Sequence, residues 1–160
     1  MTYETNTRLR PRKGYKQGFF RPKNPEKYVG KNVRNIVYRS GWELRVMLEF
    51  DSNPSVTKWS SEEVIVPYVD TRYDPPRVRR YFPDFVIESV DPSGKKSVSM
   101  IEIKPSKESK PSQSKNAKKA LRENITYVQN VLKWQAAEVF CRERGWKFVI
   151  LSEKELGIKR

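Results

Sequence analysis

The sequence predicts an α/β domain with a mixed sheet, and three observations support this fold class. Apolar residues make up 36% of the 160 residues, which is enough for the core of one domain. Beyond about residue 40, the hydrophobic pattern changes from helical to alternating and then back to helical. The resulting order of a helix, three strands, a helix and a strand is typical of an α/β domain with a mixed sheet. We therefore expect one domain over residues 39–160, preceded by an arm over residues 1–38.

The arm is predicted to be irregular and basic. Three prolines and three glycines lie among its Lys and Arg residues, without sustained periodicity. Its aromatic side chains could stack on bases or attach the arm to the domain, and we expect attachment. These aromatic residues are Tyr15, Phe19, Phe20 and Tyr28.

The first helix is predicted to begin at Ser40 and to end at Asn53-Pro54. Ser40 and Glu43 form an S-x-x-E capping box, which is typical of a helix N-terminus. The apolar face at helical spacing consists of Trp42, Val46, Met47 and Phe50.

Three strands are expected to follow. Residues 56–69 are rich in β-branched residues and predict the first strand. A polar loop over 70–80 leads to the second strand, 81–90, and the turn sequence DPSGKK at 91–96 leads to the third, 97–105.

The second helix is predicted from about Arg122 to Arg144, after a Ser/Lys-rich loop over 106–119 that is long enough to suggest a function. Gly145 is expected to stop it. A short strand, WKFVIL, and a last helical turn, SEKELG, complete the domain. The helical spacing that predicts the apolar face is given by Ile125, Val128, Val131 or Leu132, Gln135, Val139 and Cys141.

Two carboxylates and a lysine are predicted to meet across the hairpin of the second and third strands. Side chains alternate between the faces of a strand, so Glu102 and Lys104 lie side by side while Ile101 and Ile103 face the core. Asp84 starts the preceding strand, and antiparallel pairing brings it opposite Glu102, in a register that the sequence does not fix.

Two carboxylates this close repel each other, and a divalent cation would remove the repulsion. The sequence contains no His, so proton transfer and metal binding depend on carboxylates and lysine. Hard oxygen ligands from Asp84, Glu102 and the Ile103 carbonyl favour Mg²⁺ or Mn²⁺. Such an ion promotes phosphodiester hydrolysis, while Lys104 would orient the attacking water and stabilise charge on the phosphate.

Glu43 has two candidate roles. As the third residue of its helix it can accept a hydrogen bond from the backbone N–H of Ser40, or it can reach a second metal ion. Both roles cannot be filled completely at once. Glu62 and Glu63 compete for the second role, and alternation lets one of them face the site; we favour Glu43.

The pattern Pro-Asp followed by Glu-x-Lys is weak by itself in a chain this rich in charges. Glu108-Ser109-Lys110 also fits it, although it lies in a polar loop. The alternative interpretation makes Asp84 a turn residue and the Glu102–Lys104 pair a solvated ion pair of little energetic value.

The motifs are more specific in combination. The segments YRSGWELRVMLEFDSNPSVTKWSSEEVIVPY, RYFPDFVIE, MIEIKP and KWQAAEVFCRERGWKFVILSEKEL resemble the PD-(D/E)xK nuclease superfamily. Within it, they are similar to the head completion nucleases of T-even-like tailed phages and, more distantly, to the N-terminal domain of TnsA-type transposon-end endonucleases. The resemblance covers about residues 36–156.

The resemblance implies a restriction-endonuclease-like αβββαβ core and a metal-dependent DNA nuclease. The catalytic residues that it implies are Glu43, Asp84, Glu102 and Lys104. It also implies a role in processing packaged DNA, so that a filled phage head can join its tail.

The net charge of +14 is unevenly distributed and favours a polyanionic partner. Residues 1–39 hold 11 Lys and Arg against 2 acids, and residues 95–122 hold 9 against 2, while residues 41–94 are acidic overall. A solvated basic surface is the alternative. The candidate contacts to double-stranded DNA are Lys107, Lys110, Lys115, Lys118, Lys119, Lys133 and Gln135.

Two other functions stay open: a repair or transposon-end endonuclease, and a non-enzymatic connector that grips DNA or an acidic portal surface. No apolar run approaches the roughly 18 residues of a membrane span, and the single cysteine, Cys141, fits a reducing compartment. We expect the cytoplasm of an infected bacterium, or the virion, with a phage portal or neck protein as a partner. A dimer would suit double-strand cleavage, but the sequence shows no dimer interface.

Overall fold

The computed structural model of the chain describes residues 16–158. Its elements, in chain order, are β1 (Gly18–Phe20), η1 (Pro25–Lys27), β2 (Ile36–Tyr38), α1 (Gly41–Ser52), β3 (Val56–Ser61), β4 (Val66–Asp70), β5 (Arg77–Tyr81), β6 (Phe85–Val90), β7 (Lys96–Ile103), η2 (Ser106–Ser109), α2 (Ala117–Arg144) and β8 (Lys147–Leu151).

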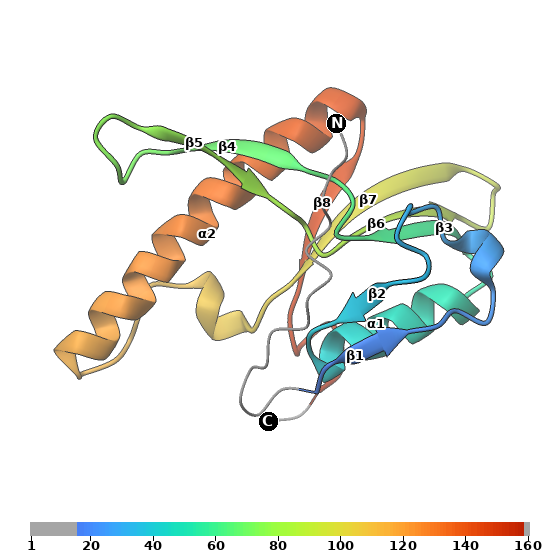
Figure 1. Cartoon of the computed structure of the whole chain (residues 1–160), viewed down its shortest axis with the longest axis horizontal. Helices are drawn as coiled ribbons and strands as arrows, with labels where there is room; N and C mark the ends of the chain where they lie inside the picture. Colours follow the sequence, from blue (N-terminus) through green and yellow to red (C-terminus); the bar gives the residue numbers. More distant parts are fainter. Residues whose placement is uncertain (1–15, 159–160) are drawn as a thin grey trace.

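A four-stranded mixed sheet forms the centre of the fold, in the order β3-β6-β7-β8. The pairs β3–β6 and β6–β7 are antiparallel, whereas β7 and β8 are parallel. Parallel neighbours need a long crossover, and α2 provides it between β7 and β8 (Figure 1). The predicted α/β class with a mixed sheet is confirmed.

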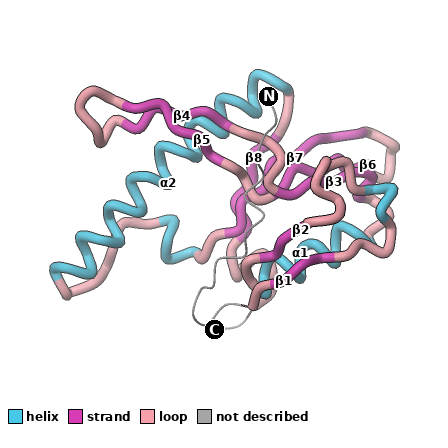
Figure 2. Tube along the Cα trace, in the orientation of Figure 1, coloured by secondary structure: helices cyan, strands magenta, loops and turns pink. Residues whose placement is uncertain are grey.

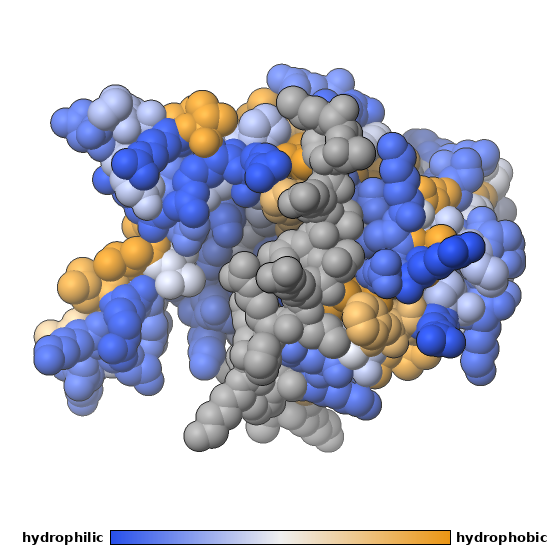
Figure 3. Space-filling view, viewed as in Figure 1, coloured by the Kyte–Doolittle hydropathy of each residue, from blue (hydrophilic) through white to orange (hydrophobic). Residues whose placement is uncertain are grey.

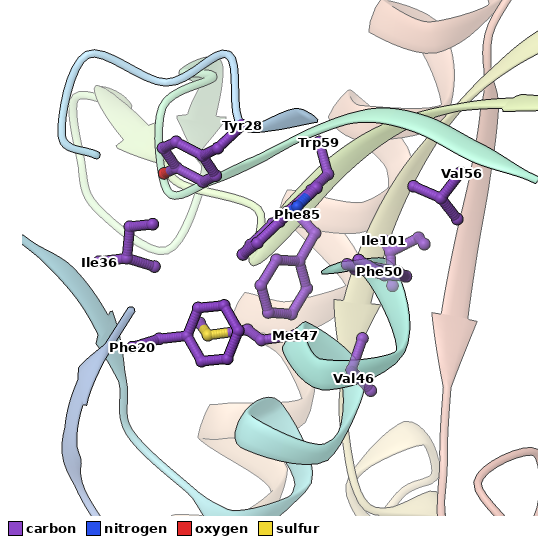
Figure 4. Packing of buried hydrophobic residues seen from close by; sticks show 10 residues of the cluster. All are labelled: Phe20, Tyr28, Ile36, Val46, Met47, Phe50, Val56, Trp59, Phe85 and Ile101. Carbon is purple, nitrogen blue, oxygen red and sulfur yellow. The ribbon is translucent and has the colours of Figure 1, made fainter. Parts of the chain in front are cut away.

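The face of the sheet toward α1 carries an aromatic core cluster (Figure 4). Trp59 is fully buried within it, and its ring centroid lies 4.7 Å from that of Tyr28 and 5.8 Å from that of Phe20. The buried members of the cluster are Phe20, Tyr28, Ile36, Val46, Met47, Phe50, Val56, Trp59, Phe85 and Ile101.

The opposite face of the sheet packs against α2. Met100 of β7 points to this side, whereas its neighbour Ile101 points to the α1 side, as strand alternation requires. The buried members of this second cluster are Val66, Tyr68, Tyr81, Met100, Trp134, Ala137 and Cys141.

The described part of the predicted arm, residues 16–38, is irregular except for the short elements β1, η1 and β2. β1 and β2 pair antiparallel. Phe20 and Tyr28 are buried, which confirms attachment, while Phe19 is 52% exposed. Residues 1–15, with Tyr15, lie outside the described residues. The boundary at residue 38 stays a prediction, although the described part of the arm belongs to the domain core.

The predicted first helix is confirmed as α1. Ser40 is its N-cap, and its hydroxyl accepts a hydrogen bond from the backbone N–H of Glu43 at 3.1 Å. Val46, Met47 and Phe50 are buried, as their helical spacing predicts.

The predicted first strand, residues 56–69, is two strands in two sheets. The chain turns at Glu62, which adopts a left-handed φ of 55°. Beyond it, β4 leaves the central sheet and pairs with β5, in a segment that was predicted to be a loop. The alternation of β5 was missed because four of its five residues are exposed and three of these are arginines. Figure 2 shows the β4–β5 hairpin lying across α2.

The second helix begins at Ala117, earlier than predicted, with Asn116 as its N-cap. Gly145 ends it in the left-handed conformation, as predicted, at a φ of 70°. SEKELG forms the predicted single turn: the backbone N–H of Leu156 donates to the Ser152 carbonyl at 3.1 Å, and Glu155 accepts the backbone N–H of Ser152 at 2.7 Å.

The predicted apolar face of α2 is wrong except for Cys141, which is buried, and Leu132, which packs against the second cluster. Ile125, Val128 and Val139 are between 43% and 49% exposed. The N-terminal half of α2 extends beyond the sheet and has little to pack against (Figure 1). The residues that it buries are Asn130, Trp134, Ala137 and Cys141.

Candidate active site

The adjoining ends of β6 and β7 bring Asp84 and Glu102 together. Phe85 of β6 is the register partner of Ile101 of β7, so one further step along the strands sets Asp84 opposite Glu102. The Asp84 carboxylate oxygen Oδ2 accepts a hydrogen bond from the backbone N–H of Ile103 at 2.7 Å. Asp84 is therefore held against the Glu-Ile-Lys strand.

Glu102 is buried between two polar side chains. The hydroxyl of Tyr81 donates a hydrogen bond to its Oε2 at 2.5 Å, and the Lys104 ammonium lies 3.7 Å from its Oε1. The side chain of Glu102 is 9% exposed and that of Lys104 is 25% exposed. The alternative of a solvated Glu102–Lys104 pair is therefore excluded.

Glu43 lies at the N-terminus of α1, where its carboxylate oxygen Oε2 accepts the backbone N–H of Arg39 at 2.8 Å. The capping box predicted the N–H of Ser40 as the donor instead. Of the two competitors, Glu62 is held by the Arg39 guanidinium at 2.9 Å and 3.2 Å, while Glu63 accepts from the backbone N–H of Asn32. Of the two competitors for the metal-binding role, Glu62 is therefore the one that lies near Glu43, because both contact Arg39.

The three carboxylates affect one another's ionisation. Burial raises the pKa of Glu43 to about 7, Glu62 and Glu102 add to the shift, and Arg39 opposes it. Burial raises the pKa of Asp84 well above its ordinary range, and Glu102 and Glu43 raise it further. Burial also raises the pKa of Glu102, against the opposing effects of Lys104 and Tyr81. Protein groups thus leave the negative charge at this site incompletely balanced.

The donor set limits how a metal ion could be held. Across residues 16–158, no three side chains of His, Cys, Asp or Glu converge to hold a metal ion. Asp84 and Glu102 nevertheless offer two adjacent carboxylates, and carboxylate oxygens are the ligands that Mg²⁺ and Mn²⁺ prefer. The site therefore fits an ion held by two carboxylates together with backbone oxygen and water.

Comparison with known proteins identifies the family. The TnsA-like endonuclease N-terminal family matches residues 53–153. The chain belongs to this family. It is also similar to the head completion nuclease of Enterobacteria phage T4, at 38% identity over 147 residues, which cover 86% of this chain and 93% of the phage protein. The restriction-endonuclease-like fold and the nuclease activity that the sequence resemblance implied are thereby confirmed. No helix in the described part of this TnsA-like nuclease is both long enough and apolar enough to span a membrane.

The TnsA-like nuclease brings one predicted DNA-contacting residue, Lys133, close to the carboxylates. Its ammonium lies 5.6 Å from the centroid of the Tyr81 ring. Burial lowers the pKa of Lys133; the charge of Glu102 opposes this, and that of Lys104 reinforces it. Gln135, two residues further along α2, is exposed.

The five loop and helix lysines predicted to contact DNA are all exposed. Lys107 and Lys110 line two hollows between η2 and the start of α2, and Lys119 lines one of them. Lys115 and Lys118 line neither. DNA contact by these lysines stays a prediction.

Two residues of the site were missed in the sequence: Tyr81, which holds Glu102, and Arg39, which holds Glu43 and Glu62. The sequence predicts Tyr81 in the second central strand, whereas it ends β5. The register of the β4–β5 hairpin, which sets Val66 opposite Tyr81, was the missing information.

Proposed function

We propose that this nuclease hydrolyses phosphodiester bonds of DNA with the help of Mg²⁺ and acts in phage head completion. The observation that supports the chemistry best is the opposed pair of carboxylates, half-buried Asp84 and buried Glu102, with the Lys104 ammonium beside Glu102. A protein that only grips DNA gains nothing from burying acids, because each buried charge without a partner costs stability.

Asp84 and Glu102 would hold the ion, Mg²⁺ or Mn²⁺ in its place. The Ile103 carbonyl is the expected third ligand, and Glu43 would contribute through water or at a second ion. When bound, the ion polarises the scissile phosphorus–oxygen bond and makes water nucleophilic near neutral pH.

The protein's own groups hold and complement this site. The Ile103 N–H orients Asp84, and the Tyr81 hydroxyl orients Glu102. Lys104 is placed to stabilise the negative charge that grows on the phosphate as the water attacks.

The similarity to the phage T4 nuclease over 93% of that protein supports the biological role. In that role the nuclease would process packaged double-stranded DNA, so that a filled head can join its tail. A portal or neck protein would be its partner, in the cytoplasm of the infected bacterium or in the virion.

The family match also favours a second candidate function. The family that matches residues 53–153 is named after TnsA-like endonucleases. Cleavage of transposon ends or of damaged DNA would use the same chemistry. Complementation distinguishes the two. In cells infected by phage T4 that lacks its head completion nuclease, we expect the wild-type chain to restore infectious particles and Asp84→Asn not to.

Cleavage of supercoiled plasmid tests the chemistry. With Mg²⁺ we expect nicking or linearisation, and with EDTA none. Asp84→Asn and Lys104→Met should each lower the rate at least about 100-fold. Glu108→Gln is the matched control, because Glu108 belongs to the other Glu-x-Lys sequence and should retain full activity. Equal rates in all variants would contradict the assignment.

A further inference from the structure

The β4–β5 hairpin is fixed directly to the active site. Its last residue, Tyr81, is 4% exposed and donates its hydroxyl proton to Glu102. β4 packs against α2, and Gln129 of α2 donates a hydrogen bond to the Tyr68 hydroxyl at 3.4 Å. A ligand bound along this hairpin would therefore hold a defined position relative to the carboxylates.

The hairpin has two chemically different faces. The register pairs Tyr68 with Arg79 and Asp70 with Arg77, so these arginines share the face of Tyr81. This face turns toward α2, because Tyr68 and Tyr81 belong to the core cluster that α2 covers. Arg80 and Val78 lie on the other face, which leaves Val78 74% exposed.

One arginine of the hairpin has a structural role. Asp70 is fully buried, and Arg72 binds both of its carboxylate oxygens, at 2.8 Å and 2.7 Å. These bonds hold the pKa of Asp70 well below its ordinary range. Arg72 also reaches the carbonyl of Ile125 in α2 at 3.5 Å. Its donors are thus largely used within the protein.

Arg77 and Arg79 keep most of their hydrogen-bond donors available. The Arg79 side chain is 42% exposed and makes one bond to Asp70, at 3.3 Å. Arg77 is exposed, and its guanidinium stacks 4.3 Å from the centroid of the Tyr73 ring, an arrangement that leaves its N–H groups clear of the ring. A guanidinium carries five N–H donors, so both arginines can bind further anions.

The positive charges form a row that leads from the active site. Lys104 lies beside Glu102, Lys133 lies over the Tyr81 ring, and Arg79 and Arg77 follow at two-residue steps along β5. Figure 3 shows hydrophilic residues over the hairpin and a hollow between it and the N-terminal half of α2. A row of cations that repel one another is stabilised by a polyanion.

We propose that Arg77 and Arg79, together with Lys133, bind the phosphates of the DNA strand that enters the active site. This rests on the proposed function and assigns the DNA track to the inner face of the hairpin, in addition to the lysines after β7. A two-residue step of a strand is about 7 Å, which is close to the spacing of consecutive phosphates along one DNA strand, so the two arginines can take neighbouring phosphates. Phosphate contacts carry no sequence information, which agrees with sequence-tolerant cleavage.

The test compares the two faces of one strand. A fluorescein-labelled DNA duplex is titrated with protein in EDTA, so that it is bound but not cut, at several KCl concentrations. For Arg77→Ala/Arg79→Ala we expect dissociation constants raised at least about tenfold, and a salt dependence of log K that is less steep by about two. The matched control, Arg80→Ala, changes the same residue type on the opposite face and should stay within about twofold of wild type.

Two further variants separate binding from folding. Arg77→Ala alone removes an exposed side chain and should lower affinity with unchanged thermal stability. Arg77→Lys/Arg79→Lys keeps the charges and should retain the wild-type salt dependence. In Mg²⁺, the double alanine variant should raise KM for plasmid cleavage more than it lowers kcat.

The outcomes distinguish this inference from the proposed function. Suppose that wild type binds and cuts DNA, but that Arg77→Ala/Arg79→Ala binds the duplex as tightly as Arg80→Ala does. The assignment of the DNA track to the hairpin is then wrong, while the proposed nuclease function is unaffected. If wild type neither binds nor cuts DNA, both are wrong.

Discussion

Two aspartates, buried Asp51 and half-buried Asp84, occupy opposite kinds of environment. Asp51, at the end of α1, is 4% exposed and accepts the backbone N–H groups of Lys23 and Asn24 at 2.9 Å and 3.0 Å. Asp84 accepts one backbone N–H and lies near two other acids. The same residue type thus joins the N-terminal segment to the domain in one place and remains incompletely balanced in the other.

The difference shows where this fold separates stability from chemistry. The Asp51 corner is further closed by the Lys27 ammonium, which donates to the carbonyls of Phe50 and Asn53 at 2.5 Å and 2.8 Å. The Asp51 carboxylate and these carbonyls all have hydrogen-bond partners within the protein. The acids at Asp84 destabilise the folded chain unless a cation joins them, which is the signature of a site kept for a ligand.

The largest expected effect is at the structural aspartate. Asp51→Ala removes two charge-assisted hydrogen bonds and leaves two N–H groups without their acceptor, so we expect a loss of about 4 kcal/mol in unfolding free energy. Urea denaturation measures it. Plasmid cleavage per folded molecule should be unchanged; a variant that is fully stable would show that the corner does not hold the N-terminal segment.

A substitution at Glu43 is expected to raise the unfolding free energy rather than lower it. The Glu43 pKa of about 7 in the folded chain exceeds the usual 4.5, so the folded state binds the proton more tightly. Wild type therefore loses stability as the pH rises from about 4.5 to about 7. Glu43→Gln lacks this loss and should be more stable by about 2–3 kcal/mol at pH 8 without metal, and equal to wild type near pH 4. Thermal unfolding at the two pH values checks this, and a difference independent of pH would contradict it.

A smaller effect is expected from Tyr81→Phe. The substitution removes the hydroxyl that orients Glu102 and should cost about 1 kcal/mol in stability. Cleavage should fall about tenfold, mainly in kcat, because a carboxylate that holds the cation is no longer oriented. Steady-state kinetics on plasmid DNA provide the measurement; unchanged kcat would remove Tyr81 from the site.

The smallest change in stability is expected from Glu62→Gln. It weakens a partly exposed pair with Arg39 and should cost about 0.5 kcal/mol. Since the charge of Glu62 raises the pKa of Glu43, its removal should lower that pKa below about 7. Carbon-13 NMR titration of the glutamate side chains can follow the shift, and a higher pKa would contradict the assigned proximity.

The sequence predicted the central motif because strand alternation and a short turn are local properties. Asp84, Glu102 and Lys104 follow from period-two spacing around DPSGKK, and Ser40 and Gly145 follow from capping preferences. These features require no knowledge of distant contacts.

The missed features depend on tertiary packing. The turn at Glu62 sends β4 into a second sheet, and the arginines of β5 conceal its pairing. The apolar residues of α2 suggested the wrong buried face because half of the helix lies beyond the sheet. The hydrogen bond from Tyr81 to Glu102 follows only from the position of the β4–β5 hairpin, which the sequence does not predict.

Calorimetric titration of Mn²⁺ into the metal-free protein at pH 8 tests the central claim most directly, because it needs no DNA. Wild type should bind the ion with release of protons from the raised-pKa carboxylates, and Asp84→Asn and Glu102→Gln should each weaken binding at least about tenfold. Asp51→Asn, the matched control, should bind as wild type does. Equal Mn²⁺ binding by wild type and Asp84→Asn would contradict the account.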